Sequence, residues 1–260
     1  MNENIPHLWD ILSFKGAFYF GRSSTMKQIQ QRQFLHNMYF YNRMFNFEVY
    51  TLLQSMINCN SSILVHGRKG SGGDELLKTL FDAKSNSVST LYLGPDSIKS
   101  LYPRRKIMEI NSSDFDAMNV SPLDFIGSTA AVINGLTASN INLFLYMCST
   151  GHGLASLEGE TLNFALDEVA ELLENSSRSM ESIGTIDYVL TVEAHKLVSI
   201  SEVISKDGKH TLQPFAEFVG GNEYSFYPCV TTSKIDKMRL ENFEEAERFI
   251  QSIQTYSSNS

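Results

Sequence analysis

Cysteine is scarce in this chain of 260 residues, and its three cysteines form no recognisable pair. Cys59, Cys148 and Cys229 stand far apart and none belongs to a C-x-x-C spacing, so the sequence supports neither a disulfide framework nor a zinc site. This usage is typical of a reducing compartment such as the cytosol or the nucleus. No apolar run approaches the length of about 18 residues that a membrane helix needs. The first residues also lack the regions of a signal peptide, so we expect no contact with a membrane.

Positive charge is in short supply as well. The formal net charge of -8 argues against a protein that coats nucleic acid by itself, although it leaves room for a local basic patch on a subunit of a larger assembly. The apolar share of 42% is ordinary for a soluble globular domain, and the length fits one large domain or two small ones.

The spacing of apolar residues predicts an α/β fold. Residues 27–58 contain neither proline nor glycine and carry apolar side chains at helical spacing, which predicts a long N-terminal helix. Short apolar runs predict five strands, at residues 62–67, 89–94, 140–147, 187–192 and 224–230. Helices are expected between and after them, at residues 74–83, 122–136, 160–174 and 240–253. Strands that alternate with helices indicate a parallel five-stranded sheet flanked by helices.

A glycine-rich turn stands between the first strand and the next helix, where a phosphate-binding P-loop belongs. That motif reads G-x-x-x-x-G-K-[ST], with a lysine and a hydroxyl for the phosphates and Mg²⁺. Here Gly67 and Gly72 frame the loop around Gly70, but Gly73 holds the lysine position and Asp74 the hydroxyl position. Asp74 also brings a carboxylate to the anion-attracting end of a helix. The residues Gly67, Gly70, Gly72, Gly73 and Asp74 therefore predict a vestigial P-loop without bound nucleotide.

The strand ends give no sign of an ATPase. A carboxylate is expected at the end of the neighbouring strand to hold Mg²⁺. After residues 140–147, however, Cys148, Ser149 and Thr150 follow, and no Asp or Glu appears before Glu158. At the end of the next strand, Glu193 would repel a phosphate. We therefore expect no enzyme, no cofactor and no metal.

Several segments resemble the AAA+-like domain of the origin recognition complex subunit 2 family. Residues 34–81 resemble its start, with an aromatic-rich helix, an apolar strand, a glycine turn without lysine, and the helix start Asp74-Glu75-Leu76-Leu77. Residues 143–160, 187–201 and 212–232 resemble later parts of that domain in the same order. The resemblance spans residues 28–232 and implies an AAA+-like P-loop fold. It divides the chain into an N-terminal arm at 1–25, the degenerate P-loop domain at 26–232, and a C-terminal helix and tail at 233–260, with no winged-helix domain evident.

The resemblance also implies a role and partners. It describes a non-catalytic structural subunit that helps to encircle DNA and load the helicase at replication origins in the nucleus. Its partners would be the other subunits of the complex, especially subunit 3, and double-stranded DNA within that complex. The insertion after the second strand faces the DNA channel in such proteins. It carries the candidate DNA-binding residues Lys99, Tyr102, Arg104, Arg105 and Lys106. Nearby acidic residues also suit a plain solvated turn.

Two alternatives stay open. One is a nucleotide-binding AAA+ relative outside replication. The other is a cysteine peptidase or pseudopeptidase, because residues 149–153 resemble the histidine loop of caspase- and legumain-like enzymes. In those enzymes the nucleophilic cysteine ends the next strand, where this chain has His195. Cys148 stands only four residues from His152 and would need an oriented base.

Overall fold

The computed structural model describes residues 44–85, 88–117, 130–150, 152–160, 164–174 and 180–258. The predicted arm at 1–25, most of the long helix at 27–58 and the start of the helix at 122–136 lie outside the described residues. The last part of that long helix is present as α3 (Phe47–Asn58). Asn46 caps it by accepting a hydrogen bond from the Val49 N–H at 3.0 Å.

The centre of the molecule is a nine-stranded sheet in the order β3-β2-β4-β5-β1-β6-β7-β8-β9. Its first six strands are parallel: β1 (Ile63–Gly67), β2 (Thr90–Gly94), β3 (Ile107–Asn111), β4 (Ala130–Asn134), β5 (Gly153–Glu158) and β6 (Tyr188–Glu193). The last three run antiparallel: β7 (Lys196–Lys206), β8 (Lys209–Gly220) and β9 (Glu223–Phe226). The predicted α/β fold with a mostly parallel sheet and flanking helices is confirmed, whereas the predicted number of five strands is wrong.

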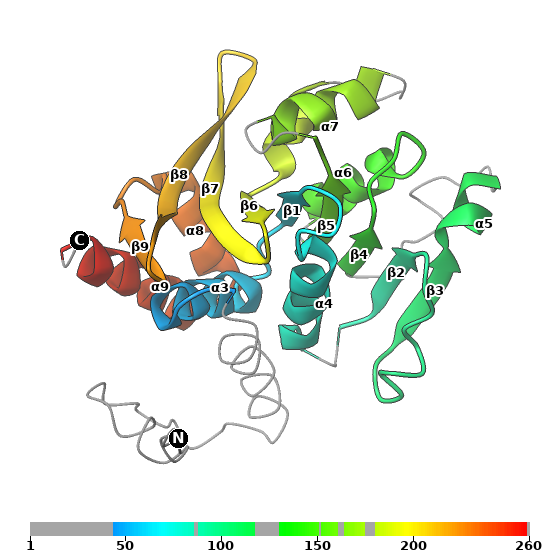
Figure 1. Cartoon of the computed structure of the whole chain (residues 1–260), viewed down its shortest axis with the longest axis horizontal. Coiled ribbons are helices and arrows are strands. Elements are labelled where there is room, and N and C mark those ends of the chain that lie inside the picture. Colours follow the sequence, from blue (N-terminus) through cyan, green and yellow to red (C-terminus); the bar gives the residue numbers. More distant parts are fainter. Residues whose placement is uncertain are drawn as a thin grey trace, which may run out of the picture.

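Helices cover both faces of this sheet (Figure 1). Alternate residues of β1 show the division, because Ile63 and Val65 belong to one buried cluster and Leu64 belongs to the other. The first cluster contains side chains of α3, α4 (Gly73–Ala83), α8 (Thr232–Glu241) and α9 (Phe243–Ser257). The second contains side chains of α5 (Ser112–Ala117), α6 (Ile141–Thr150), α7 (Ala165–Glu174) and the 3-10 turn η3 (Met180–Thr185). β1 is therefore buried on both faces, and the loop that follows it has a fixed base.

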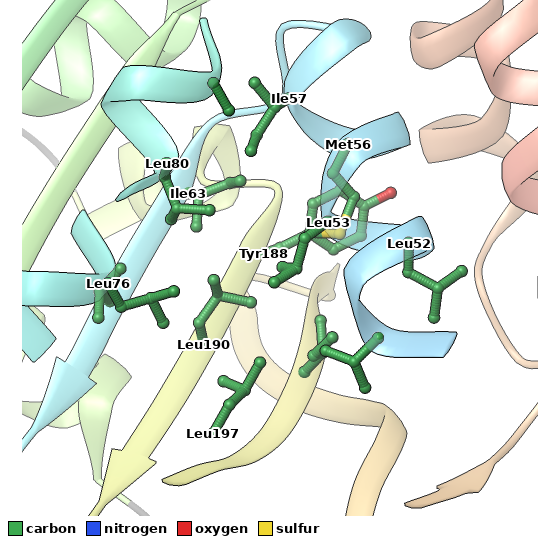
Figure 2. Packing of buried hydrophobic residues seen from close by; sticks show 14 of the residues in the cluster. Leu52, Leu53, Met56, Ile57, Ile63, Leu76, Leu80, Tyr188, Leu190 and Leu197 are labelled. Carbon is green, nitrogen blue, oxygen red and sulfur yellow. The ribbon is translucent and has the colours of Figure 1, made fainter. Parts of the chain in front are cut away.

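The α3 side of the core is shown in Figure 2. Leu53 and Met56 of α3 point toward Tyr188 of β6. Leu190 lies two residues further along β6, on the same face of the sheet. Tyr188 also packs edge-on against Phe215 of β8, with 5.7 Å between the ring centroids. The antiparallel strands are thus part of the same core as the parallel ones. None of the described helices is long and apolar enough to cross a membrane.

Three predicted elements are placed wrongly. Residues 140–147 do not form a strand, because residues 141–147 lie in helix α6. The predicted helix at 122–136 contains strand β4, and the loop predicted after residue 147 contains strand β5. The strand predicted at 224–230 is shorter and forms β9, while the long hairpin of β7 and β8 before it was not predicted.

Candidate functional site

A tight loop joins β1 to α4 at the carboxyl edge of the parallel strands. It turns back on itself through the Ser71 N–H, which donates to the Arg68 carbonyl oxygen at 2.9 Å. Gly70 and Gly72 have φ values of 72° and 98°, a backbone conformation that glycine adopts without strain. A Cβ added at Gly67 would lie 2.5 Å from Ser71 Oγ and from the Val192 carbonyl oxygen. Gly67, Gly70 and Gly72 are therefore needed for the conformation of this loop.

The N-terminus of α4 carries no side-chain cap. Its N-cap residue is Gly72, and the first intrahelical bond runs from the Leu76 N–H to the Gly72 carbonyl oxygen at 3.0 Å. The N–H groups of Gly73, Asp74 and Glu75 come before that bond, so the helix itself supplies no acceptor for them. Such groups, together with the helix dipole, favour an anion.

Ser71 adds a hydroxyl to the inside of the loop. Its side chain is buried, with 7% of the residue exposed. The Oγ atom has no hydrogen-bond partner among the described residues. Because a buried hydroxyl without a partner costs free energy, it marks a place where a ligand atom would be stabilised.

Asp74 lies in the first turn of α4, but its side chain does not cap the helix. Its Oδ1 accepts a hydrogen bond from Ser156 Oγ of β5 at 3.3 Å, and the same hydroxyl donates to Asn134 Oδ1 of β4 at 3.0 Å. Ser156 Oγ in turn accepts the Gly135 N–H at 3.0 Å. The single hydroxyl proton of Ser156 is thus shared between the oxygens of Asp74 and Asn134. A carboxylate, an amide oxygen and a hydroxyl converge beside the loop, and such oxygen atoms are ligands that Mg²⁺ accepts.

The strand end assigned from sequence to the Mg²⁺ carboxylate is the wrong one. Cys148, Ser149 and Thr150 end helix α6, not a strand. The parallel strands beside the loop end at Asn134, Glu158 and Glu193. Glu158 lies next to Gly67 in the register of β5 and β1. A carboxylate therefore does end the strand next to the loop. Among the described residues, no group of three or more His, Cys, Asp or Glu side chains is placed to hold a metal.

Two neighbouring segments support the loop, and no motif in the sequence predicts either contact. In the turn between β6 and β7, the His195 N–H donates to the Ser71 carbonyl oxygen at 2.7 Å. On the opposite side, the Gly159 N–H donates to the Gly67 carbonyl oxygen at 3.1 Å. Glu168 of α7 fixes this second segment, because its carboxylate accepts the Glu160 N–H at 3.2 Å and pairs with buried His66 at 2.7 Å.

The predicted DNA-binding residues lie on a different part of the surface, between β2 and β3. Lys99, Arg104 and Lys106 are exposed. Arg105 donates to the carbonyl oxygens of Phe81 and Asp82, both at 2.7 Å, so its guanidinium closes the C-terminus of α4. Its centre also lies 5.0 Å from the centre of the Tyr102 ring. Tyr102 and Arg105 therefore contribute to packing, and DNA contact by these five residues stays untested.

The cysteine peptidase alternative has no support in the geometry. Cys148 is 1% exposed, and burial raises the pKa of its thiol to about 12. A nucleophilic cysteine needs a lowered pKa and access to substrate. The His152 ring faces the Asn60 carbonyl oxygen, with 3.4 Å between that oxygen and Nδ1.

No protein-family model matches the chain, and no curated protein matches it. Similar solved structures include the VirB11 ATPase of the Brucella suis type IV secretion system in complex with sulphate. It is 14% identical at a TM-score of 0.47, over 88% of this chain and 67% of that chain. The pilus retraction motor PilT with bound ADP is 14% identical at a TM-score of 0.39, over 76% and 56%. A protein of Pyrococcus horikoshii OT3 is 12% identical at a TM-score of 0.32, over 59% and 92%.

These findings correct the family predicted from the sequence. Membership of the origin recognition complex subunit 2 family is wrong, since no family model matches and the similar structures include secretion and pilus ATPases. The expectations attached to it are corrected with it: a replication role, the absence of enzyme activity, and the other subunits with duplex DNA as partners. The alternative of a nucleotide-binding AAA+ relative outside replication stays open. The domain boundaries and the nuclear location stay predictions.

Proposed function

We propose that this chain is a nucleotide-binding domain of the P-loop, AAA+-like type. Its loop of residues 67–74 would take the phosphates of a nucleoside di- or triphosphate together with a divalent cation. The observation that carries this proposal is the uncapped N-terminus of α4 beside the buried, unpartnered hydroxyl of Ser71. In open α/β sheets, ligands bind at the carboxyl ends of the strands, where this loop lies.

The backbone supplies what the side chains of the motif do not. Free N–H groups at the start of α4 and the helix dipole attract phosphate oxygens, and Ser71 Oγ adds a further donor. Gly73 leaves the lysine position without a side chain, so the charge of the phosphates needs another counter-charge. Asp74, Asn134 and Ser156 fit a divalent cation, which would neutralise part of that charge.

The same edge of the sheet also carries a carboxylate that could take part in the hydrolysis of a bound nucleotide. Glu158 is exposed and ends the strand paired with β1. General bases of this kind accept a proton from an attacking water molecule. Any hydrolysis by this site would therefore draw its base from Glu158, and Glu158→Gln is the variant that separates binding from turnover.

Isothermal titration calorimetry with ATP and with ADP tests the binding, first with Mg²⁺ and then with excess EDTA. We expect saturable binding that weakens when the cation is removed. Ser71→Asp places a fixed carboxylate where the phosphates would lie, and we expect it to lower the affinity by roughly tenfold or more, because like charges repel at short range. Ser71→Asn is the neutral comparison and should weaken binding less than Ser71→Asp, because it replaces the hydroxyl without adding a charge. If neither nucleotide binds the folded wild-type protein, the proposal is wrong.

A further inference from the structure

Arg68 is the second residue of the loop and directly follows Gly67. Its Nε donates to the Glu160 carbonyl oxygen at 3.1 Å, and its Nη1 lies 4.0 Å from Glu193 Oε1. The side chains of Arg68 and Glu193 are 61% and 45% exposed. An ion pair this long and this exposed contributes little to stability. The guanidinium is therefore held by one neutral acceptor and one weak pair.

The segment that Arg68 touches does not depend on it. The Glu160 N–H is held by Glu168, and the neighbouring Gly159 N–H is held by the Gly67 carbonyl oxygen. Glu168 is itself fixed by its pair with buried His66. The Arg68 side chain can therefore leave the Glu160 carbonyl oxygen while residues 159–160 keep their own hydrogen bonds.

The fold of the loop brings the backbone of Arg68 next to that of Ser71, close to the position where the motif has its lysine. Along the sequence Arg68 stands five residues before Gly73, the position that the motif gives to lysine. The hydrogen bond from the Ser71 N–H to the Arg68 carbonyl oxygen closes this stretch into one tight turn. The backbones of Arg68 and Ser71 are thus neighbours, and the long Arg68 side chain, 61% exposed, starts from the same turn that carries the Ser71 hydroxyl.

We infer that Arg68 is the phosphate-binding cation of this loop. Its guanidinium contacts Glu160 and Glu193 in the free protein and moves to the phosphates when a nucleotide binds. The inference rests on the proposed function and names the side chain that takes the place of the absent lysine. A guanidinium binds phosphate oxygens through two parallel N–H groups, which is a stronger interaction than its present contacts with a carbonyl and a distant carboxylate. Transfer of Arg68 costs only these two weak contacts.

Lys69 supplies the matched control. It is the next residue, it is also exposed, and its loss changes the net charge by the same amount. The affinity for ATP with Mg²⁺ is measured by calorimetry for the wild type, Arg68→Gln, Arg68→Lys and Lys69→Gln. Equal melting temperatures of the four proteins show that folding is unaffected.

We expect Arg68→Gln to weaken binding roughly tenfold, because it removes a charge-assisted hydrogen bond. Arg68→Lys should fall between the wild type and Arg68→Gln, and Lys69→Gln should weaken binding by no more than about twofold, the effect of a screened surface charge. If the wild type binds and Arg68→Gln equals Lys69→Gln, the inference is overturned while the proposed function stands. If the wild type itself binds no nucleotide, the proposed function fails and this inference with it.

Discussion

At the scale of single residues, the loop of residues 67–74 is shaped by its own glycines, while the Asp74 side chain finds its partner on another strand. Gly67 and Gly72 mark it in the sequence because only a few spacings of glycine fit between a strand and a helix. The direction of the Asp74 side chain was not predictable, because it depends on Ser156 and Asn134, two residues from other strands. The unpartnered Ser71 hydroxyl was missed for the same reason. Burial and partners of a side chain are set by segments far away in the chain.

Gly73 offers a direct test of the missing charge. A Cβ at this position would meet only Val65 Cγ1 at 3.6 Å, an ordinary contact, so the site has room for a side chain. We expect Gly73→Lys to tighten the binding of ATP with Mg²⁺ roughly tenfold, since a lysine there reaches the phosphates. Gly73→Met has nearly the same length without the charge and should change the affinity little. Identical affinities of the two variants would show that phosphates do not lie at the start of α4.

Lys84, the C-cap residue of α4, is a residue whose burial should appear in the pH dependence of stability. It is 3% exposed, and desolvation lowers its pKa from the ordinary 10.5 to about 8. Below about pH 8 the folded and the unfolded chain both hold the proton. Between about pH 8 and 10.5 the unfolded chain binds more protons, so this group makes the free energy of unfolding rise with pH.

Lys84→Met removes that contribution. We expect the stability difference between Lys84→Met and the wild type to shift in favour of the wild type as the pH rises from about 7 to 10. Urea unfolding of both proteins at several pH values measures it, and comparison of the two cancels the contributions of other groups. A difference that is constant with pH would mean that Lys84 keeps its ordinary pKa in the folded chain.

At the scale of elements, the sequence predicted those whose pattern agrees with their packing. β1, α4, β2 and β6 were all found close to their predicted positions. α6 was predicted as a strand because its short apolar run is buried almost all round, and hydrophobic periodicity cannot distinguish such a helix from a buried strand. β4 begins with two alanines, which favour helices, and was predicted as part of one.

Other strands were hidden by residues that usually mark loops. β5 contains a glycine and a serine, yet it lies between β4 and β1 at the centre of the sheet. Pro214 lies inside β8, and proline in a strand is confined to edges and irregular places. The pairing of β7 with β8 is irregular there, with a register shift between Ile200 and Ser201, which pairs with Pro214. The position of the strand ends, and with it Asn134 and Glu158, depends on these tertiary contacts.

At the scale of the whole molecule, the C-terminal helices belong to the same core as the sheet. Ala246, Phe249 and Ile253 of α9 lie in the buried cluster that also holds α3 and β6. Phe249 meets Phe215 of β8 edge-on at 5.8 Å between ring centroids. In the first turn of α9, Glu245 accepts a hydrogen bond from Ser55 of α3 at 3.2 Å. Because one sheet carries both buried clusters, loss of packing at α9 is transmitted to the strands below the loop.

Two phenylalanines of α9 test this coupling. Phe249 is fully buried, with 0% exposed, whereas Phe243 is 63% exposed on the same helix. We expect Phe249→Ala to lower the free energy of unfolding by about 3–5 kcal/mol, the cost of a large cavity in a packed core. Phe243→Ala should change it by less than about 1 kcal/mol, since little packing is lost at an exposed site. Urea unfolding followed by circular dichroism and by tyrosine fluorescence should give one coincident transition for the wild type, because α9 and the strands share one buried cluster. A separate, earlier transition in Phe249→Ala, with the sheet still folded, would show that the C-terminal helices unfold independently of the loop and its strands.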